Sequence, residues 1–228
     1  MGEPDSGVDP NLLMLIYICV LRRINAMGGL AAIVISHPHY YTTHLEWAEA
    51  FDCPVYLSWE DKDWLNRLET QEGKARKFIK GATEEIEIRG QPTGVKAIKL
   101  GGHFPGSLVC LAFKRLLVAD TLVTTPSGTG DWTKGPEGPK GKRPPGLNSF
   151  SFMWSIPNMI PLGPDEIVGM WNVLKEHEFE SSHGAFLGLD VRDGAGGDEK
   201  AVKQRLLESM QIQVSYMGWK EHAFLSVV

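Results

Sequence analysis

The chain has few cysteines and no excess of basic residues. Its three cysteines, Cys19, Cys53 and Cys110, show no C-x-x-C spacing and cannot all pair, so a disulfide framework is not indicated. The formal net charge of −5 gives no electrostatic support to nucleic-acid binding. We therefore expect a cytoplasmic protein with a small-molecule substrate, while the sequence leaves its oligomeric state open.

A long apolar run is also missing. The stretch from Leu12 to Leu21 is only ten residues long, whereas about 20 apolar residues are needed to cross a bilayer. The residues before it are acidic, unlike the basic start of a signal peptide. We expect no membrane partner and interpret residues 10–27 as a helix, with Asp9 as its N-cap and Pro10 at its first position.

The composition is that of a globular protein, with 43% apolar and 22% charged residues in a chain of 228. We predict one domain over residues 1–228, in which residues 1–27 form an atypical helical start. Residues 125–148 are rich in Gly, Pro, Ser and Lys and contain few apolar side chains. Such a composition is typical of a flexible, solvated loop insertion.

Hydrophobic patterns predict alternating strands and helices. Strands are expected at 30–36 and 54–58 with a short helix between them, an order that favours parallel pairing. Residues 84–89 and 95–100 alternate with period two, as half-buried strands do. A hairpin is expected over 107–113 and 115–119, and helices after Pro164 and over about 198–216.

A His-x-His pair follows the first of these strands. His37 and His39 come directly after the apolar run 30–35, where a turning loop could bring both imidazoles to one metal ion. Imidazole is the commonest protein ligand for zinc and also suits iron. A lone histidine is more often a satisfied core or surface residue, however, so spacing alone leaves both interpretations open. His44, slightly further on, is expected on the following helix.

Two further strand ends carry chemistry of the same kind. His103 lies in a glycine-rich loop, Gly101 to Ser107, whose backbone can turn sharply. Asp120 ends another apolar strand, where a carboxylate is costly unless it is paired or bound to a metal. It could instead cap the next turn through its own backbone. His183, before Gly184, is a fifth candidate ligand.

The order of these motifs resembles the metallo-β-lactamase superfamily. It runs from His37-x-His39 through Gly-Gly-His103-Phe-Pro-Gly and Leu-Val-Ala-Asp120-Thr to a late histidine, and matches from residue 30 to about 216. More narrowly, the segments SHPHYYTT, WAEAFDCPVYL, GGHFPGS, SFMWSIPNMIPL and HGAFLG are together similar to uncharacterised metallo-β-lactamase-like proteins. The resemblance implies an α/β (α+β) fold, a four-layer αββα sandwich with its metal site at one edge of the two sheets.

The sequence departs from the family pattern in two places. The motif His-x-His-x-Asp-His is incomplete, because Tyr41 and Thr42 stand at the Asp and second His positions that help to hold a second metal. The resemblance therefore implies one ion, with His37, His39 and His103 as its complete first site and Asp120 beside it. His183 falls where the last family ligand would be. Only 36 residues precede the motif, so we expect the first sheet to be shortened at its N-terminal side.

Three functions fit this pattern. The first is a hydrolase with one zinc ion, in which Asp120 accepts or orients a proton of the attacking water and Tyr41 donates a hydrogen bond to the oxyanion. Its substrate would be an ester, thioester, lactam or phosphodiester. The second is a mono-iron dioxygenase acting on a thiol or persulfide, with His37, His103 and Asp120 as ligands. The third is a degenerate, non-catalytic member of the family.

Overall fold

The computed structural model describes residues 10–67, 75–134 and 143–228. Its α-helices are α1 (Pro10–Ala26), α2 (His44–Phe51), α3 (Pro164–Leu174) and α4 (Val202–Tyr216), and its 3-10 helices are η1 (Pro38–Tyr40), η2 (Lys62–Trp64), η3 (Ala195–Gly197) and η4 (Ala223–Ser226). The strands are β1 (Ile33–Val34), β2 (Val55–Ser58), β3 (Arg76–Ile79), β4 (Thr83–Ile88), β5 (Gln91–Lys99), β6 (Leu108–Ala112), β7 (Arg115–Leu117), β8 (Val123–Thr124), β9 (Phe150–Ser151), β10 (Met153–Ser155), β11 (Ile160–Pro161), β12 (Ser181–His183) and β13 (Asp190–Arg192). The helices expected over residues 10–27, after Pro164 and over about 198–216 are therefore confirmed.

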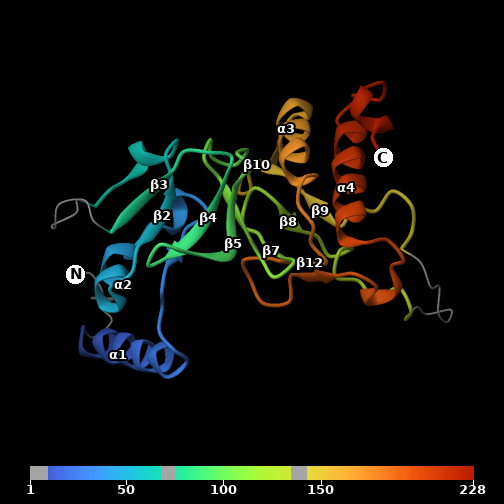
Figure 1. Cartoon of the computed structure of the whole chain (residues 1–228). Coiled ribbons are helices and arrows are strands. Elements are labelled where there is room, and N and C mark those ends of the chain that lie inside the picture. Colours follow the sequence, from blue (N-terminus) through green and yellow to red (C-terminus); the bar gives the residue numbers. More distant parts are fainter. Residues whose placement is uncertain (1–9, 68–74, 135–142) are drawn as a thin grey trace, which may run out of the picture.

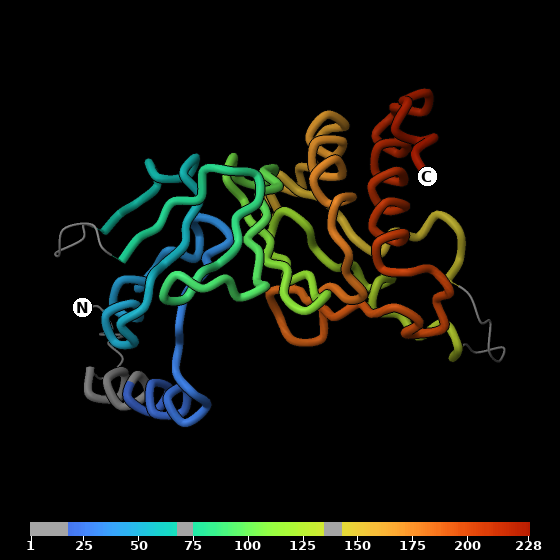
Figure 2. Tube along the Cα trace, in the orientation of Figure 1, coloured from blue at the N-terminus to red at the C-terminus, as the bar shows by residue number. Residues whose placement is uncertain are grey.

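Two main sheets organise the molecule (Figure 1). The first has the order β1-β2-β3 and is parallel throughout, so the predicted parallel pairing of the first two strands is confirmed by the register Ile33 to Val55. The second has six strands in the order β13-β12-β7-β6-β5-β4. It is antiparallel except between β7 and β12. Figure 2 shows that the N-terminal half of the chain builds one side of the molecule and the C-terminal half builds the other.

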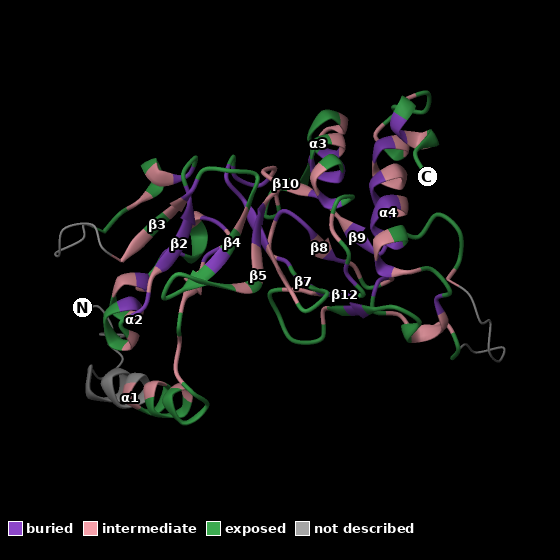
Figure 3. Ribbon diagram, viewed as in Figure 1, coloured by how far each residue is buried: buried purple, intermediate pink, exposed green. Residues whose placement is uncertain are grey.

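The core consists of three clusters, because successive strand residues point to opposite faces of each sheet. The clusters lie between four layers: helix, first sheet, second sheet and helices. Val55 and Leu57 of β2 pack with Ala48 of α2, whereas Tyr56 between them faces Ala97 and the second sheet. On the far side of the second sheet, Ile98 of β5 and Val109 of β6 pack against buried side chains of α3 and α4, namely Ile167, Met170, Leu206 and Met210. The central strands β2, β5 and β6 are therefore covered on both sides, whereas the edge strand β4 is largely exposed (Figure 3). The predicted αββα sandwich is confirmed.

The hairpin between β6 and β7 is as tight as the sequence suggests. Phe113 and Lys114 both have positive φ values, 50° and 62°, and they alone separate the paired residues Ala112 and Arg115. Two left-handed residues in a two-residue loop match the right-handed twist of the strands they join. The hairpin directs the end of β7 toward residues 118–120, and so fixes where Asp120 emerges.

Helix α1 lies beside α2, at the opposite end of the molecule from α4, and a connecting segment leads from it to β1 (Figure 1). In the part of the chain that is described, no helix is both long and apolar enough to cross a membrane.

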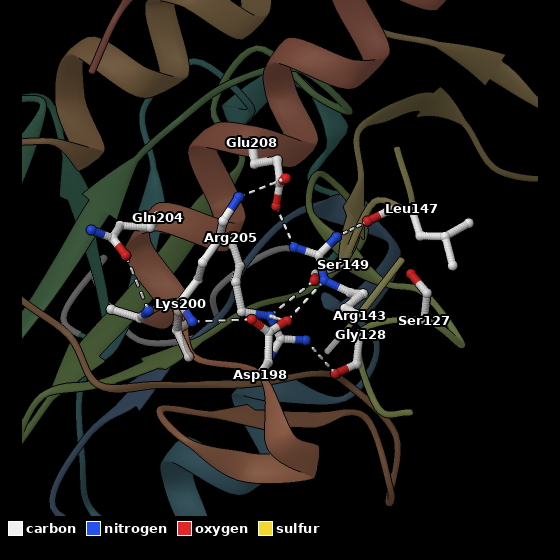
Figure 4. A network of polar contacts seen from close by, with 12 residues as sticks. Ser127, Gly128, Arg143, Leu147, Ser149, Asp198, Lys200, Gln204, Arg205 and Glu208 are labelled. Atoms are coloured by element: carbon white, nitrogen blue, oxygen red, sulfur yellow. Dashed lines mark hydrogen bonds and ion pairs between the residues drawn. The ribbon is translucent and has the colours of Figure 1, made fainter. Parts of the chain in front are cut away.

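A buried ionic network fastens the polar segment 125–148 to α4 (Figure 4). Residues 135–142 lie outside the described part, but both ends of the segment are held. Asp198 accepts a hydrogen bond from Arg143 (Nε–Oδ2, 2.8 Å) and pairs with Arg205 (3.2 Å). Arg205, which is 1% exposed, also donates to the carbonyl of Gly128 at 2.8 Å and to Ser149 at 3.0 Å. The loop predicted here as flexible and solvated is thus anchored at both ends.

Replacing Asp198 should test this anchor. The change Asp198→Ala leaves two buried guanidinium groups without their shared carboxylate, so we expect a loss of about 3 kcal/mol in the free energy of unfolding. Urea unfolding followed by circular dichroism measures it. The matched control is Glu178→Ala, which breaks an ion pair between Lys203 and an exposed carboxylate and should leave the midpoint unchanged. Equal urea midpoints for the two variants would show that Asp198 does not stabilise the fold.

Candidate metal centre

His37 and His39 are placed by the end of β1. The strand continues past Val34 as Ile35 donates to the carbonyl of Tyr56 (3.1 Å), and the carbonyl of Ser36 then accepts from Leu108 of the second sheet (2.8 Å). This last bond ties the two sheets together immediately before His37. One turn of 3-10 helix, η1, follows and brings His39 to the same side as His37, with ring centroids 5.0 Å apart.

His103 is placed by a loop that requires glycine. Gly101 and Gly102 have φ values of +70° and +88°, which L side chains rarely adopt. A Cβ atom at Gly102 would also lie 2.5 Å from Oγ1 of Thr121. That hydroxyl donates to the carbonyl of Gly101 at 2.6 Å and accepts from the amide of His103 at 3.3 Å. Because Thr121 follows Asp120, one side chain fixes the His103 loop relative to the carboxylate.

The three imidazoles and Asp120 converge on one point. Each of His37, His39, His103 and Asp120 offers one ligand atom, and these atoms all lie within 4.8 Å of one another. Oδ2 of Asp120 lies 3.4 Å from His37 Nε2, 3.9 Å from His39 Nδ1 and 3.8 Å from His103 Nε2. His37 and His103 are buried, whereas the side chain of His39 is 57% exposed, so solvent reaches the group from the His39 side.

The electrostatics of the group suit a cation. The interaction with His37 holds the pKa of Asp120 below its ordinary value, against the effect of burial, and the carboxylate is ionised at neutral pH. Burial lowers the pKa of His103, and the neighbouring His37 and His39 add to this effect, so its imidazole is neutral. Neutral imidazoles beside an ionised carboxylate are the protonation states that metal binding requires.

Two hydrogen-bonding details show that the residues fit a metal ion. Nε2 of His37 is buried and has no hydrogen-bond partner of good geometry, although it faces Asp120. Nδ1 of His103 lies 2.7 Å from the carbonyl of Trp154 and therefore donates to it, which leaves Nε2 with its lone pair toward the group. Such a backbone acceptor behind a histidine is the usual way in which proteins orient a metal-binding imidazole.

Comparison with known proteins agrees with this geometry. A family model described as the metallo-beta-lactamase superfamily matches residues 29–178. The chain belongs to the metallo-β-lactamase superfamily. The uncharacterized protein YmaE of Bacillus subtilis (strain 168) is 32% identical over 199 residues, which cover 84% of this chain and 57% of that protein. The chain thus spans less than two thirds of the length of this relative.

Two solved structures resemble the fold more distantly. A B3 metallo-β-lactamase with an active-site glutamic acid is 11% identical, with a TM-score of 0.47 over 89% of this chain and 76% of the other. A flavoprotein from Thermotoga maritima is 14% identical, with a TM-score of 0.48 over 85% of this chain and 45% of the other.

His183 does not join the cluster in this metallo-β-lactamase-like chain. It lies in β12, where its Nε2 is 3.0 Å from the hydroxyl of Ser181 and its Nδ1 is 3.2 Å from a carboxylate oxygen of Asp190. Both ring nitrogens are therefore engaged by strand neighbours, since Ser181 is two residues earlier on the same face and Asp190 is its cross-strand partner. Its predicted role as a fifth ligand has no support in this arrangement.

His44 stands outside the cluster as well. It is the first residue of α2, as expected, and is buried. Its Nδ1 contacts the carbonyl of Tyr41, and its Nε2 accepts a hydrogen bond from Arg76 at 3.0 Å.

The tyrosine beside the group is Tyr40, and not Tyr41, for which we predicted a catalytic role. Tyr41 is 2% exposed and packs in the core with Ile35 and Leu57. Tyr40 instead has its ring 4.9 Å from that of His37, and burial followed by the charge of Asp120 raises its pKa. The role predicted for Tyr41 as a hydrogen-bond donor to the substrate therefore has no support here, because Tyr40 is the tyrosine beside the group.

A buried carboxylate, that of Asp61, holds the loop that carries His103. Asp61 is fully buried, and its Oδ1 accepts from the amide of Gly106 at 3.0 Å. A Cβ atom at Gly106 would lie 2.3 Å from Oγ of Ser58 and 2.7 Å from Oδ2 of Asp61. The loop thus approaches the end of β2 as closely as a glycine permits. Sequence reasoning missed this support, because no local pattern pairs Asp61 with Gly106, which is 45 residues away.

Substituting Gly106 should disturb His103, a candidate metal ligand, without unfolding the chain. Gly106→Ala forces the loop away from Ser58 and Asp61, so we expect the affinity for Zn²⁺ to fall by about tenfold or more. Competition against a chromogenic chelator measures this affinity, and circular dichroism reports the fold. Gly169→Ala is the matched control, because a Cβ atom there meets nothing within 4 Å. Unchanged zinc affinity in the Gly106 variant would show that this close approach does not position His103.

Proposed function

We propose that the chain is a metal-dependent hydrolase that works with one zinc ion. The observation that carries the proposal is the convergence of four ligand atoms, from His37, His39, His103 and Asp120, within 4.8 Å of one another. In this proposal the three histidines hold the ion, Asp120 lies beside it, and one position stays open; this is the arrangement of catalytic zinc sites, whereas structural sites are closed by four protein ligands. The exposed side of His39 leaves a route for a substrate.

The chain's own residues can then be given roles in hydrolysis. Zinc, when bound, supplies a water nucleophile at neutral pH and polarises the substrate oxygen. His103 is kept in the ligating tautomer by the carbonyl of Trp154, and Asp120 is placed to orient the attacking water and accept its proton. The raised pKa of Tyr40 keeps its hydroxyl protonated, so it can donate a hydrogen bond to the developing oxyanion.

Three features favour one ion over two. Tyr41 and Thr42 replace the Asp and His that the family motif offers to a second metal. Tyr41 is a poor ligand besides, because burial raises its pKa above the ordinary value and its ring is part of the core. The nitrogens of His183 are already engaged by Ser181 and Asp190. We propose a small-molecule substrate and a cytoplasmic location on the composition alone.

Loss of one ligand should remove the metal without harming the fold. His39 is the ligand to replace, because its largely exposed side chain contributes little packing. We expect His39→Ala to lose stoichiometric zinc and the rise in melting temperature that zinc gives to the unaltered protein. Elemental analysis and thermal unfolding with and without zinc measure both. His177→Ala, a change outside the cluster, is the control. Unchanged metal content in His39→Ala would support the degenerate, non-catalytic alternative.

The two tyrosines can be distinguished by removing one hydroxyl at a time. Tyr40→Phe removes a donor beside Asp120, so we expect kcat for a chromogenic ester to fall by about 100-fold with KM nearly constant. Tyr41→Phe should leave kcat within about twofold, because the core holds that ring. Steady-state kinetics of the zinc-loaded proteins make the comparison. The reverse order would restore the role first predicted for Tyr41.

The choice of metal decides between hydrolysis and the iron-based alternative. His37, His103 and Asp120 would also suit a mono-iron dioxygenase of thiols or persulfides. Purified protein that carries iron and consumes oxygen with a persulfide would establish that function. A zinc-containing protein that hydrolyses esters would establish the one proposed here.

A further inference from the structure

We propose that the metal centre serves an uncharged substrate with an apolar acyl or aryl group next to its scissile carbonyl, and not an anionic phosphodiester. This inference rests on the proposed function and narrows its substrate class. It comes from exposed aromatic side chains on the elements that adjoin the centre, and from the lack of a lysine or arginine paired with Asp120 among the described residues.

Three exposed aromatic side chains belong to separate elements that adjoin the centre. Tyr40 of η1, Trp64 of η2 and Trp154 of β10 are 41%, 61% and 54% exposed. With Ile156, Met159 and Ile160 they form what we call the apolar rim. Large apolar side chains gathered beside a functional group, and left in water, are typical of a binding surface.

Each part of the apolar rim contacts the centre. The Tyr40 ring lies 4.9 Å from that of His37. Trp64 packs edge-on against Phe104 at 5.3 Å, and Phe104 in turn lies within 5.6 Å of all three histidine rings. Trp154 supplies the carbonyl that orients His103. Tyr40 and Trp64 are thus linked to the histidines through ring contacts, and the segment around Trp154 is linked to them through its backbone.

The hairpin of β10 and β11 brings the aliphatic part of the apolar rim to the same place. The register shifts between Met153 and Ser155, so Trp154 sits at a bulge, the irregularity that lets a strand re-aim a backbone group. Leu162, directly after β11, lies against Gly102 of the His103 loop. Held at both points, the hairpin carries Ile156, Met159 and Ile160, which are 36%, 76% and 42% exposed.

Cations that could receive a phosphate are absent from this surface in the described residues. Asp120 has ion-pair contacts with the three histidines only. Lys62 and Lys80 lie over the ring of Trp59 instead. The ammonium of Lys99 is bound by Glu60 at 2.7 Å. Enzymes that take phosphodiesters use arginine or lysine to neutralise the non-bridging oxygens, and this centre provides neither.

Turnover by the zinc-loaded protein tests the substrate class. We expect kcat/KM for p-nitrophenyl esters to rise about threefold per methylene from acetate to hexanoate, since each methylene leaves water for an apolar surface. Trp64→Ala should flatten this series, whereas Trp219→Ala, which removes a similarly exposed tryptophan from the C-terminal region, should not. Bis(p-nitrophenyl) phosphate should be hydrolysed at least tenfold more slowly than hexanoate. A flat ester series, or a preference for the phosphodiester, overturns the proposal.

Binding measured without turnover separates this proposal from the proposed hydrolase. N-methylbutanamide and N-methylhexanamide are uncharged and carry acyl chains of different length on a carbonyl that resists hydrolysis. Titrated into metal-free protein and followed by NMR, the hexanamide should bind several-fold more tightly, and Trp64→Ala should remove the difference. If the longer amide binds more tightly while no ester is hydrolysed, the apolar rim is confirmed as a binding surface and the hydrolase proposal is wrong. Equal affinities for the two amides in the unaltered protein overturn the apolar rim.

Discussion

The carboxylate of Asp120 has no lysine or arginine within ion-pair distance among the described residues. The arrangement of the centre depends on this lack of a fixed cation. Its neighbours are three imidazoles, one of which, His37, is almost wholly buried with an unpartnered nitrogen facing the carboxylate. The interaction with His37 keeps this half-buried carboxylate ionised, with its pKa below the ordinary value, and a bound cation would add the fixed positive charge that no lysine or arginine of the described residues provides there. The second sheet presents Asp120, the first presents His37 and His39, and the bond between Ser36 and Leu108 joins them at the rim.

Asp198, another buried carboxylate in the same molecule, has its charge balanced in a different way. Asp198 is held by two arginines and by the amide of Lys200, so its charge is balanced from within the chain. Its pKa is kept below the ordinary value by those partners, despite burial. An internally balanced charge of this kind fastens a loop to a helix. Among the described residues, Asp120 has no such fixed cation beside it but only three imidazoles, and this difference favours a binding centre over a structural ion pair.

The parts of this protein that follow from sequence are those set by local pattern. Three such features are present in the structure as expected: the alternation along residues 95–100, the apolar strand that leads into His37, and the tight turn at Lys114. The four ligands were predicted because each stands at the end of an apolar strand. What the pattern could not supply is orientation. Whether Tyr40 or Tyr41 faces the ligands depends on one turn of η1, and a difference of one residue there moves a ring from core to surface.

Contacts between distant segments were equally beyond local pattern. His183 matches the family motif, yet its ring is held by Ser181 and Asp190, a cross-strand arrangement that depends on the pairing of β12 with β13. The carbonyl that orients His103 comes from Trp154, which lies at a bulge that the hydrophobic periodicity of the sequence does not predict. A ligand's chemistry can thus be inferred from residue type and strand position, whereas its tautomer depends on a backbone group 51 residues away. The hairpin whose backbone orients His103 also carries the exposed side chains of Trp154, Met159 and Ile160, which belong to the surface that we propose a substrate would meet.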